Sequence, residues 1–199
     1  MSIPDPIRRV FVGATKRCVV RGTSERQPQI LLPGAFNPLH HGHRKMAHCA
    51  GKFTGKSVSF EISIDNIDKP AVTESEICDR LNQFSDTETV WLTRAATFAE
   101  KAMIFPGTMF AIGADTLQRI ALPHYYSGVG NDDSLQEMRR SIEQIEANEC
   151  CFLVFGRLIE NVFQSAGDLV LDESLRNLCH EISESLFRED ISSTAVRKG

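Results

Sequence analysis

Apolar residues recur along the chain in two alternating patterns. Short runs rich in β-branched and aromatic residues are typical of buried strands, and they lie at 29–33, 58–64, 90–93, 109–113 and 151–156. Helical spacing of apolar residues predicts helices at 41–50, 73–84, 95–103, 133–147 and 175–186. Strands that alternate with helices pair in parallel through right-handed crossovers. We therefore expect a doubly wound α/β fold, with a mainly parallel sheet of about five to six strands and helices on both faces.

The turn after the first of these strands contains the most distinctive chemistry in the chain. Residues 34–43 read GAFNPLHHGH, and a helical pattern follows. This places His40 and His43 at the start of a helix, whose positive end and unpaired N–H groups attract anions. Gly42 between them leaves room for a phosphate or a nucleobase to approach. Since ligands of doubly wound sheets bind beyond the carboxyl ends of the strands, we expect an anion site here.

Composition narrows the classes of partner. The chain has 199 residues, 42% of them apolar, and a net charge of −4, which argues against a nucleic-acid partner held through its phosphates. The longest apolar run, at 150–155, is far shorter than the roughly 20 residues that cross a bilayer, so we expect no membrane partner. The six cysteines form no CxxC pair and no secretory segment is apparent, which favours reduced thiols and a cytoplasmic location.

The first 28 residues differ from the rest in charge. They contain six basic and two acidic side chains, a local excess of four positive charges. We separate this basic segment, 1–28, from a main domain at 29–199. A basic surface strand or arm near an anion site is the favoured interpretation, and an organelle transit peptide is the alternative.

Two separated motifs resemble those of a known superfamily. GAFNPLHHGH resembles the GxFxPxHxGH signature of the HxGH nucleotidyltransferases, and ISSTAVR at 191–197 resembles their second signature, ISSTxxR. FAIGADT at 110–116 resembles the GAD segment of nicotinamide and nicotinate mononucleotide adenylyltransferases, and 60–70 is similar to segments of some of their relatives. The resemblance covers residues 29–197. It implies a Rossmann-like fold and a nucleotidyltransferase domain at 29–199.

The resemblance also implies a reaction. A phosphate of the acceptor attacks the α-phosphorus of ATP and pyrophosphate leaves, with Mg²⁺ accompanying ATP and no covalent enzyme intermediate. His40, His43 and Arg197 are the implied catalytic residues, and His43 is the expected transition-state stabiliser. The implied nucleotide-binding residues are Gly34, Ala35, Phe36, Gly42, Lys45, Gly113, Asp115, Ser192, Ser193 and Thr194. Candidate acceptor contacts are Asn37, Thr93, Arg94 and Arg157, and we expect no metal ligand from protein side chains.

Each of these assignments has a simpler alternative. The histidines could form a surface cluster or a zinc site, although no nearby Cys, Asp or Glu completes a tetrahedral set. The 192–197 segment could be an ordinary helix cap, and so could Asp115. Lys101 could line the acceptor site or lie on a solvated helix face, and Trp91 is expected in the core.

A second phosphate-binding motif is also suggested by spacing alone. Residues 50–57, AGKFTGKS, fit the spacing of a phosphate-cradling P-loop if alanine is allowed first. Such a loop must follow a strand and open a helix, whereas here a helix precedes it and a strand follows. We therefore predict a helix-to-strand turn at 50–57.

The sequence thus favours an adenylyltransferase most similar to those that make NAD or its deamido precursor. Its partners would be ATP and a small phosphorylated acceptor, and a homo-oligomer is compatible with the sequence. A phosphopantetheine adenylyltransferase or a cytidylyltransferase is the alternative within the chemistry; Asn37, where those relatives commonly have Asp, and the GAD segment disfavour it. A non-catalytic nucleotide-binding module is the alternative outside it, favoured by the short stretch after Arg197.

Overall fold

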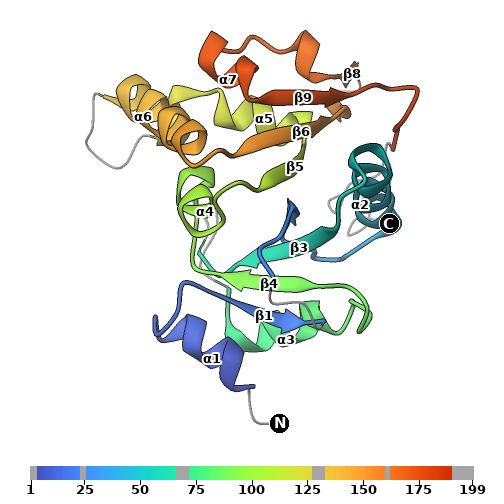
Figure 1. Cartoon of the computed structure of the whole chain (residues 1–199), viewed down its shortest axis with the longest axis vertical. Coiled ribbons are helices and arrows are strands. Elements are labelled where there is room, and N and C mark those ends of the chain that lie inside the picture. Colours follow the sequence, from blue (N-terminus) through green and yellow to red (C-terminus); the bar gives the residue numbers. More distant parts are fainter. Residues whose placement is uncertain (1–3, 23–25, 66–71, 127–132, 160–161, 190–199) are drawn as a thin grey trace.

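Seven strands form one central sheet. The computed structural model describes residues 4–22, 26–65, 72–126, 133–159 and 162–189. From β9 at the top of Figure 1 to β1 at the bottom, the strand order is β9-β6-β5-β2-β3-β4-β1, and only β1 is antiparallel to its neighbour. The strands are β1 (Arg17–Arg21), β2 (Ile30–Pro33), β3 (Val58–Ser63), β4 (Val90–Thr93), β5 (Met109–Gly113), β6 (Cys151–Phe155) and β9 (Cys179–Ile182). A doubly wound, mainly parallel sheet is confirmed, with edge strands on both sides that raise the number to seven.

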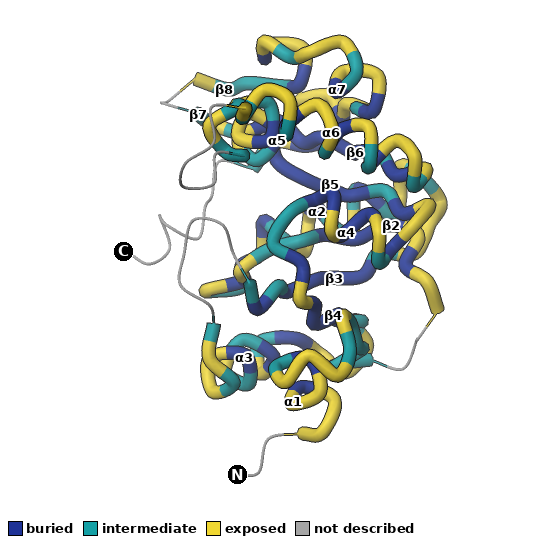
Figure 2. The backbone as a smooth tube through the Cα atoms, turned by 90° about the vertical axis from the view of Figure 1, so that its left-hand side faces the viewer, coloured by how far each residue is buried: buried dark blue, intermediate teal, exposed yellow. Residues whose placement is uncertain are grey.

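Helices cover both faces of the sheet, as predicted. One face packs against α1 (Asp5–Phe11), α2 (His41–Thr54) and α3 (Glu74–Leu81). The other packs against α4 (Phe98–Ile104), α5 (Ala114–Ile120), α6 (Ser134–Ala147) and α7 (Glu173–Asn177). Successive strand residues alternate between the two cores: Ile30 and Leu32 face α2, and Leu31 faces the opposite side. Figure 2 shows the central strands buried and the outer helix surfaces exposed.

Short elements complete the described part of the chain. A two-stranded antiparallel ribbon, β7 (Arg157–Ile159) and β8 (Val162–Gln164), follows β6. There are two 3₁₀ turns: η1 (Pro123–Tyr126) lies between α5 and α6, and η2 (Ala166–Asp168) follows β8. No described helix is long and apolar enough to span a bilayer.

Local sequence signals explain where two helices begin and end. Glu76 Oε2 accepts from the Thr73 N–H at 2.8 Å, and Thr73 Oγ1 accepts from the Glu76 N–H at 3.3 Å, which caps α3. Helix α2 continues past the predicted residue 50 to Thr54 and ends at Gly55, whose φ of 70° favours glycine. Residues 50–54 are thus the last turn of α2, and 55–57 connect this helix to β3, so the segment is a helix-to-strand connection and not a P-loop.

The predicted helix at 175–186 is wrong. A short helix, α7, ends at Asn177, and Cys179–Ile182 then forms β9. Leu175, Leu178 and Ile182 recur with helical spacing, but the open edge of β6 offers backbone partners, and Cys179 to Ile182 pair in parallel with Phe152 to Phe155. Pairing in the sheet therefore outweighs the local periodicity.

The N-terminal segment joins the same sheet. Strand β1 pairs with β4, and α1, which the sequence did not predict, buries Ile7 and Val10 in the core shared with α2 and α3. Arg17 lies over the rings of Trp91 and Phe105, with its guanidinium carbon 5.3 Å and 4.7 Å from their centroids. Trp91 is 4% exposed and lies in the core as expected. The division at residue 28 stays a prediction of the sequence.

Candidate active site

A cavity of about 770 Å³ opens at the switch in strand order between β2 and β5. Chain connections diverge at this point, since β3 and β4 extend the sheet on one side and β6 and β9 on the other. The cavity walls come from the turn after β2, from α2, α3, α4 and α5, and from β3, β5 and β7. Of the residues predicted for the site, those that line it are Gly34, Ala35, Asn37, His43, Gly113, Asp115 and Arg157.

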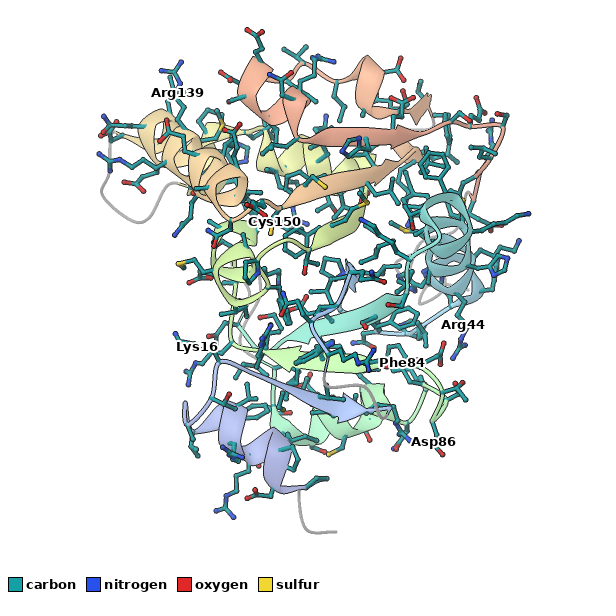
Figure 3. All side chains as sticks on the ribbon, in the orientation of Figure 1. Lys16, Arg44, Phe84, Asp86, Arg139 and Cys150 are labelled. Atoms are coloured by element: carbon teal, nitrogen blue, oxygen red, sulfur yellow. The ribbon has the colours of Figure 1, made fainter. Side chains whose placement is uncertain are left out.

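The turn after β2 is fixed by a buried aromatic ring. Phe36 adopts a φ of 44° and is 1% exposed, packed edge-to-face on Phe60, Phe84 and His43. A Cβ on Gly34 would lie 2.7 Å from Cζ of Phe36, so this position requires glycine. Phe36 itself is not among the cavity-lining residues and supports the turn from behind. Arg44, on α2, donates from Nη2 to the Gln83 carbonyl at 2.8 Å, directly before Phe84 in the chain. Arg44 and Phe84 are both labelled in Figure 3.

His43 presents a neutral imidazole to the cavity. Its Nδ1 accepts from the backbone N–H of His40 at 3.3 Å. The pKa of His43 is lowered to about 3, chiefly by burial and in addition by the nearby His40 and Arg157. A neutral imidazole that accepts at Nδ1 has its proton on Nε2. His43 is therefore a hydrogen-bond donor for a ligand in the cavity.

His40 lies behind His43 at the start of α2. The two rings stack with their centroids 3.7 Å apart. His40 is 8% exposed, and neither ring nitrogen has a hydrogen-bond partner among the described residues. Burial is the largest cause of its lowered pKa, and Arg157 and His41 lower it further while Glu189 opposes them. Buried polar atoms without partners are rare in folded proteins, and this group adjoins the predicted anion site.

Arg157, on the same wall, is a cation that pairs with none of the described acidic residues. It is the first residue of β7; its Nη2 contacts Met46 Sδ at 3.5 Å, and its buried Nη1 has no partner among the described residues. A Cβ on Gly113 would lie 2.9 Å from Arg157 Nε and 2.3 Å from Asp115 Oδ1, so glycine lets both side chains lie against the strand end. This guanidinium can accept an anionic ligand without losing an existing ion pair.

A buried ion pair lines the side of the cavity formed by β3 and α4. Lys101 Nζ donates to Glu61 Oε1 at 2.6 Å and to the Ala95 carbonyl at 2.9 Å. Thr93, which is fully buried, also donates to Glu61 Oε1. Glu61 is 1% and Lys101 5% exposed, so the alternative of a solvated helix face for Lys101 is wrong. Thr93 contributes to this wall through Glu61 and is not itself among the lining residues.

Sequence reasoning missed Glu61 and Arg80. The signal for Glu61 was a charged residue inside the apolar strand run, between Phe60 and Ile62. Arg80 lies on α3, where its Nη1 donates to the Ala35 carbonyl at 3.2 Å and its Nη2 lies 3.9 Å from Glu76 Oε1. Burial lowers the pKa of Arg80 and Glu76 partly opposes this. The contact of Arg80 joins residues that are 45 positions apart, so the sequence around Arg80 does not indicate it.

Several other predicted residues lie outside the cavity lining. Gly42 is buried in the first turn of α2. Lys45 and His41 both pair with Glu189, with His41 Nε2 at 3.3 Å from Glu189 Oε2, and Lys45 is exposed. Arg94 pairs with Asp65, a cavity residue, at 3.1 Å. The predicted residues Ser192, Ser193, Thr194 and Arg197 lie outside the described part of the chain.

The described residues include no group of three or more His, Cys, Asp or Glu side chains that could hold a metal ion. The described cysteines are all unpaired thiols. The cavity's polar groups are instead imidazole, guanidinium and ammonium donors, together with separate carboxylates.

Comparison with known proteins agrees with this geometry. The family model described as cytidylyltransferase-like matches residues 31–199. The chain therefore belongs to the cytidylyltransferase-like family, within the nucleotidyltransferase superfamily. This membership supports nucleotidyltransferase activity in general. A search of curated proteins finds no match to the chain.

Proposed function

We propose that the protein transfers an adenylyl group from ATP to a small acceptor that carries a phosphate, and releases pyrophosphate. Nicotinamide or nicotinate mononucleotide is the acceptor we favour. The observation that supports this most directly is the neutral His43, held at the helix start with its Nε2 donor available to the cavity. A cavity of about 770 Å³ is in the range of sites that hold small molecules.

The proposed chemistry is an in-line displacement. An oxygen of the acceptor phosphate forms a bond to the α-phosphorus of ATP, and the bond from that phosphorus to the pyrophosphate oxygen breaks. Negative charge gathers on the α-phosphoryl oxygens, and His43 Nε2–H would donate to one of them. Arg157 would pair with the phosphates, because its Nη1 has no partner among the described residues. Magnesium would enter with ATP, bound to its phosphates.

The described part of the chain ends on α2, two residues before the second signature begins. Glu189 pairs with Lys45 and His41 in the first turn of α2. Ile191, where that signature begins, follows Glu189 by two residues, and two residues of chain span at most about 7 Å. This supports a role for Ser193, Thr194 and Arg197 on the phosphates that leave as pyrophosphate.

The acceptor would occupy the part of the cavity next to β3, α3 and α4. Its phosphate must approach the α-phosphorus, and Arg80 is the cation of that side that bonds the turn after β2. The Arg80 guanidinium already bonds the Ala35 carbonyl, so it is positioned beside the turn that faces ATP. Arg80 would thus orient the attacking phosphate.

A pyrophosphate-release assay tests the proposal. ATP and CTP are each offered with magnesium and with nicotinamide mononucleotide, nicotinate mononucleotide or phosphopantetheine separately. We expect turnover with ATP and at least one of the two pyridine mononucleotides. Turnover with CTP alone or with phosphopantetheine alone would replace the proposed reaction by another of the same class. Binding of ATP without turnover in any combination would instead favour a non-catalytic nucleotide-binding module.

A further inference from the structure

Glu61 and Lys101 form a buried charged pair, and packing alone does not require charges at these two positions. It joins β3 to α4, with Glu61 1% and Lys101 5% exposed. Apolar residues of similar size would join these elements without removing two charges from water. Both side chains line the cavity, on the side assigned above to the acceptor. The pair is therefore placed to contact a ligand.

Hydrogen-bonding capacity remains at both members. The bonds that described residues donate to Glu61, from Thr93 and Lys101, both end on Oε1. Lys101 uses two of its three donors, on Glu61 and on the Ala95 carbonyl. Among the described residues, one carboxylate oxygen of Glu61 and one ammonium proton of Lys101 thus remain for a ligand.

The backbone of Glu61 fixes this pair relative to the turn after β2. Its carbonyl accepts from the Gly34 N–H at 3.0 Å, and its register partner in β4 is Trp91, a core residue. The pair is therefore held by the sheet and not by a loop. A hydrogen-bond donor and a hydrogen-bond acceptor held rigidly beside the turn after β2 can select the acceptor substrate by its chemistry.

We infer that Glu61 and Lys101 recognise a carboxamide on the acceptor and disfavour a carboxylate in its place. An amide offers N–H donors to Glu61 and a carbonyl oxygen to Lys101, so both members of the pair are satisfied. A carboxylate would bring a second negative charge against Glu61 and could not donate to it. The inference rests on the proposed function and selects the nicotinamide form of the acceptor over the nicotinate form.

A competition assay measures this selection. Nicotinamide and nicotinate mononucleotide are mixed in equal amounts with ATP, and the two dinucleotide products are quantified from the same tube. The product ratio is independent of how much of the protein is folded. We expect the wild type to favour the amide on the order of 100-fold, since like-charge contact and unpaired polar groups both oppose the acid.

Glu61→Gln tests the origin of the preference. Glutamine keeps the shape and an acceptor oxygen, and it adds an N–H₂ donor that a carboxylate can use. We expect the preference to shrink to within about threefold, mainly through a lower KM for the acid. Glu137→Gln, which removes the carboxylate of an exposed pair with Arg140 on α6, is the matched control and should leave the ratio unchanged.

The outcomes separate this inference from the proposed function. Turnover in which the wild type favours the acid, or treats both acceptors alike, overturns the inference and leaves the function standing. An unchanged ratio in Glu61→Gln also overturns it. Turnover with neither acceptor overturns both. If Glu61→Gln does not fold, the wild-type ratio alone decides.

Discussion

At the scale of single residues, the surroundings of His43 determine what it can do. Its Nδ1 accepts from the His40 N–H, and burial, together with His40 and Arg157, lowers its pKa to about 3. It is therefore a hydrogen-bond donor and not a proton-transfer acid near neutral pH. This suits a reaction in which charge develops on phosphoryl oxygens and must be stabilised in place.

Replacing His43 by alanine tests that role. We expect His43→Ala to lower kcat on the order of 100-fold or more, with little change in ATP affinity, because the lost donor acts mainly in the transition state. Steady-state kinetics and calorimetric titration with ATP measure the two quantities. His48→Ala, an exposed histidine on the same helix, is the control. An unchanged kcat in His43→Ala would remove His43 from the mechanism.

The lowered pKa of His43 also predicts a pH dependence of stability. In the unfolded chain this histidine binds a proton near pH 6.5, whereas in the folded protein it does so only near pH 3. As the pH falls below about 6.5, the unfolded chain takes up the proton first, so the free energy of unfolding decreases until about pH 3. The contribution is at most about 1.4 kcal/mol per pH unit. Urea unfolding at pH 7.5 and 5.0 should show a smaller decrease for His43→Asn than for the wild type; equal decreases would contradict the buried, neutral state.

At the scale of elements, the parallel strands were predictable and the edges were not. All five strand runs predicted from the sequence are strands of the sheet, because each is largely buried on both faces and mostly apolar. Strands β1 and β9 lie at the two edges, where burial is partial and the apolar signal is weak. Helix α1 has only Ile7 and Val10 buried, too few to mark a period.

Helix α1 should nevertheless contribute to the stability of the whole sheet. Ile7 is 2% exposed in the core shared with α2 and α3, so Ile7→Ala should lower the free energy of unfolding by about 2–4 kcal/mol. Val12→Ala, at a position 68% exposed at the end of the same helix, should change it by less than about 0.5 kcal/mol. Chemical denaturation compares them. Similar small effects would show that residues 1–28 fold apart from the rest.

The contact of Glu189 with α2 should matter for catalysis more than for stability. Glu189→Gln weakens the pairs with Lys45 and His41, and we expect kcat/KM for ATP to fall on the order of 10-fold, because we propose that these pairs position the signature that begins two residues later. The thermal midpoint should change little, since the Lys45 and His41 side chains in these pairs are largely exposed. Glu184→Gln, which breaks a pair with Arg188 within the same segment, is the matched control. Equal kinetic effects in both variants would argue against the anchoring role.

At the scale of the whole molecule, the cavity combines segments that are far apart in the sequence. The turn at 34–37 and the two histidines were predictable, because their chemistry is contiguous along the chain. Arg157 could be suspected from its place after a strand run. Glu61 and Arg80 could not be assigned, because their roles depend on which side of the sheet β3 and α3 occupy. That information resides in the strand order and not in the residues nearby.

Tracing the phosphates of ATP tests the central claim most directly. The protein is incubated with nicotinamide mononucleotide and with ATP labelled on either its α- or its γ-phosphate. Nucleotidyl transfer predicts that the α-label enters the dinucleotide product and the γ-label appears in pyrophosphate. Entry of the γ-label into the acceptor would show phosphoryl transfer, and retention of both labels in bound ATP would show a binding module; either result would contradict the account.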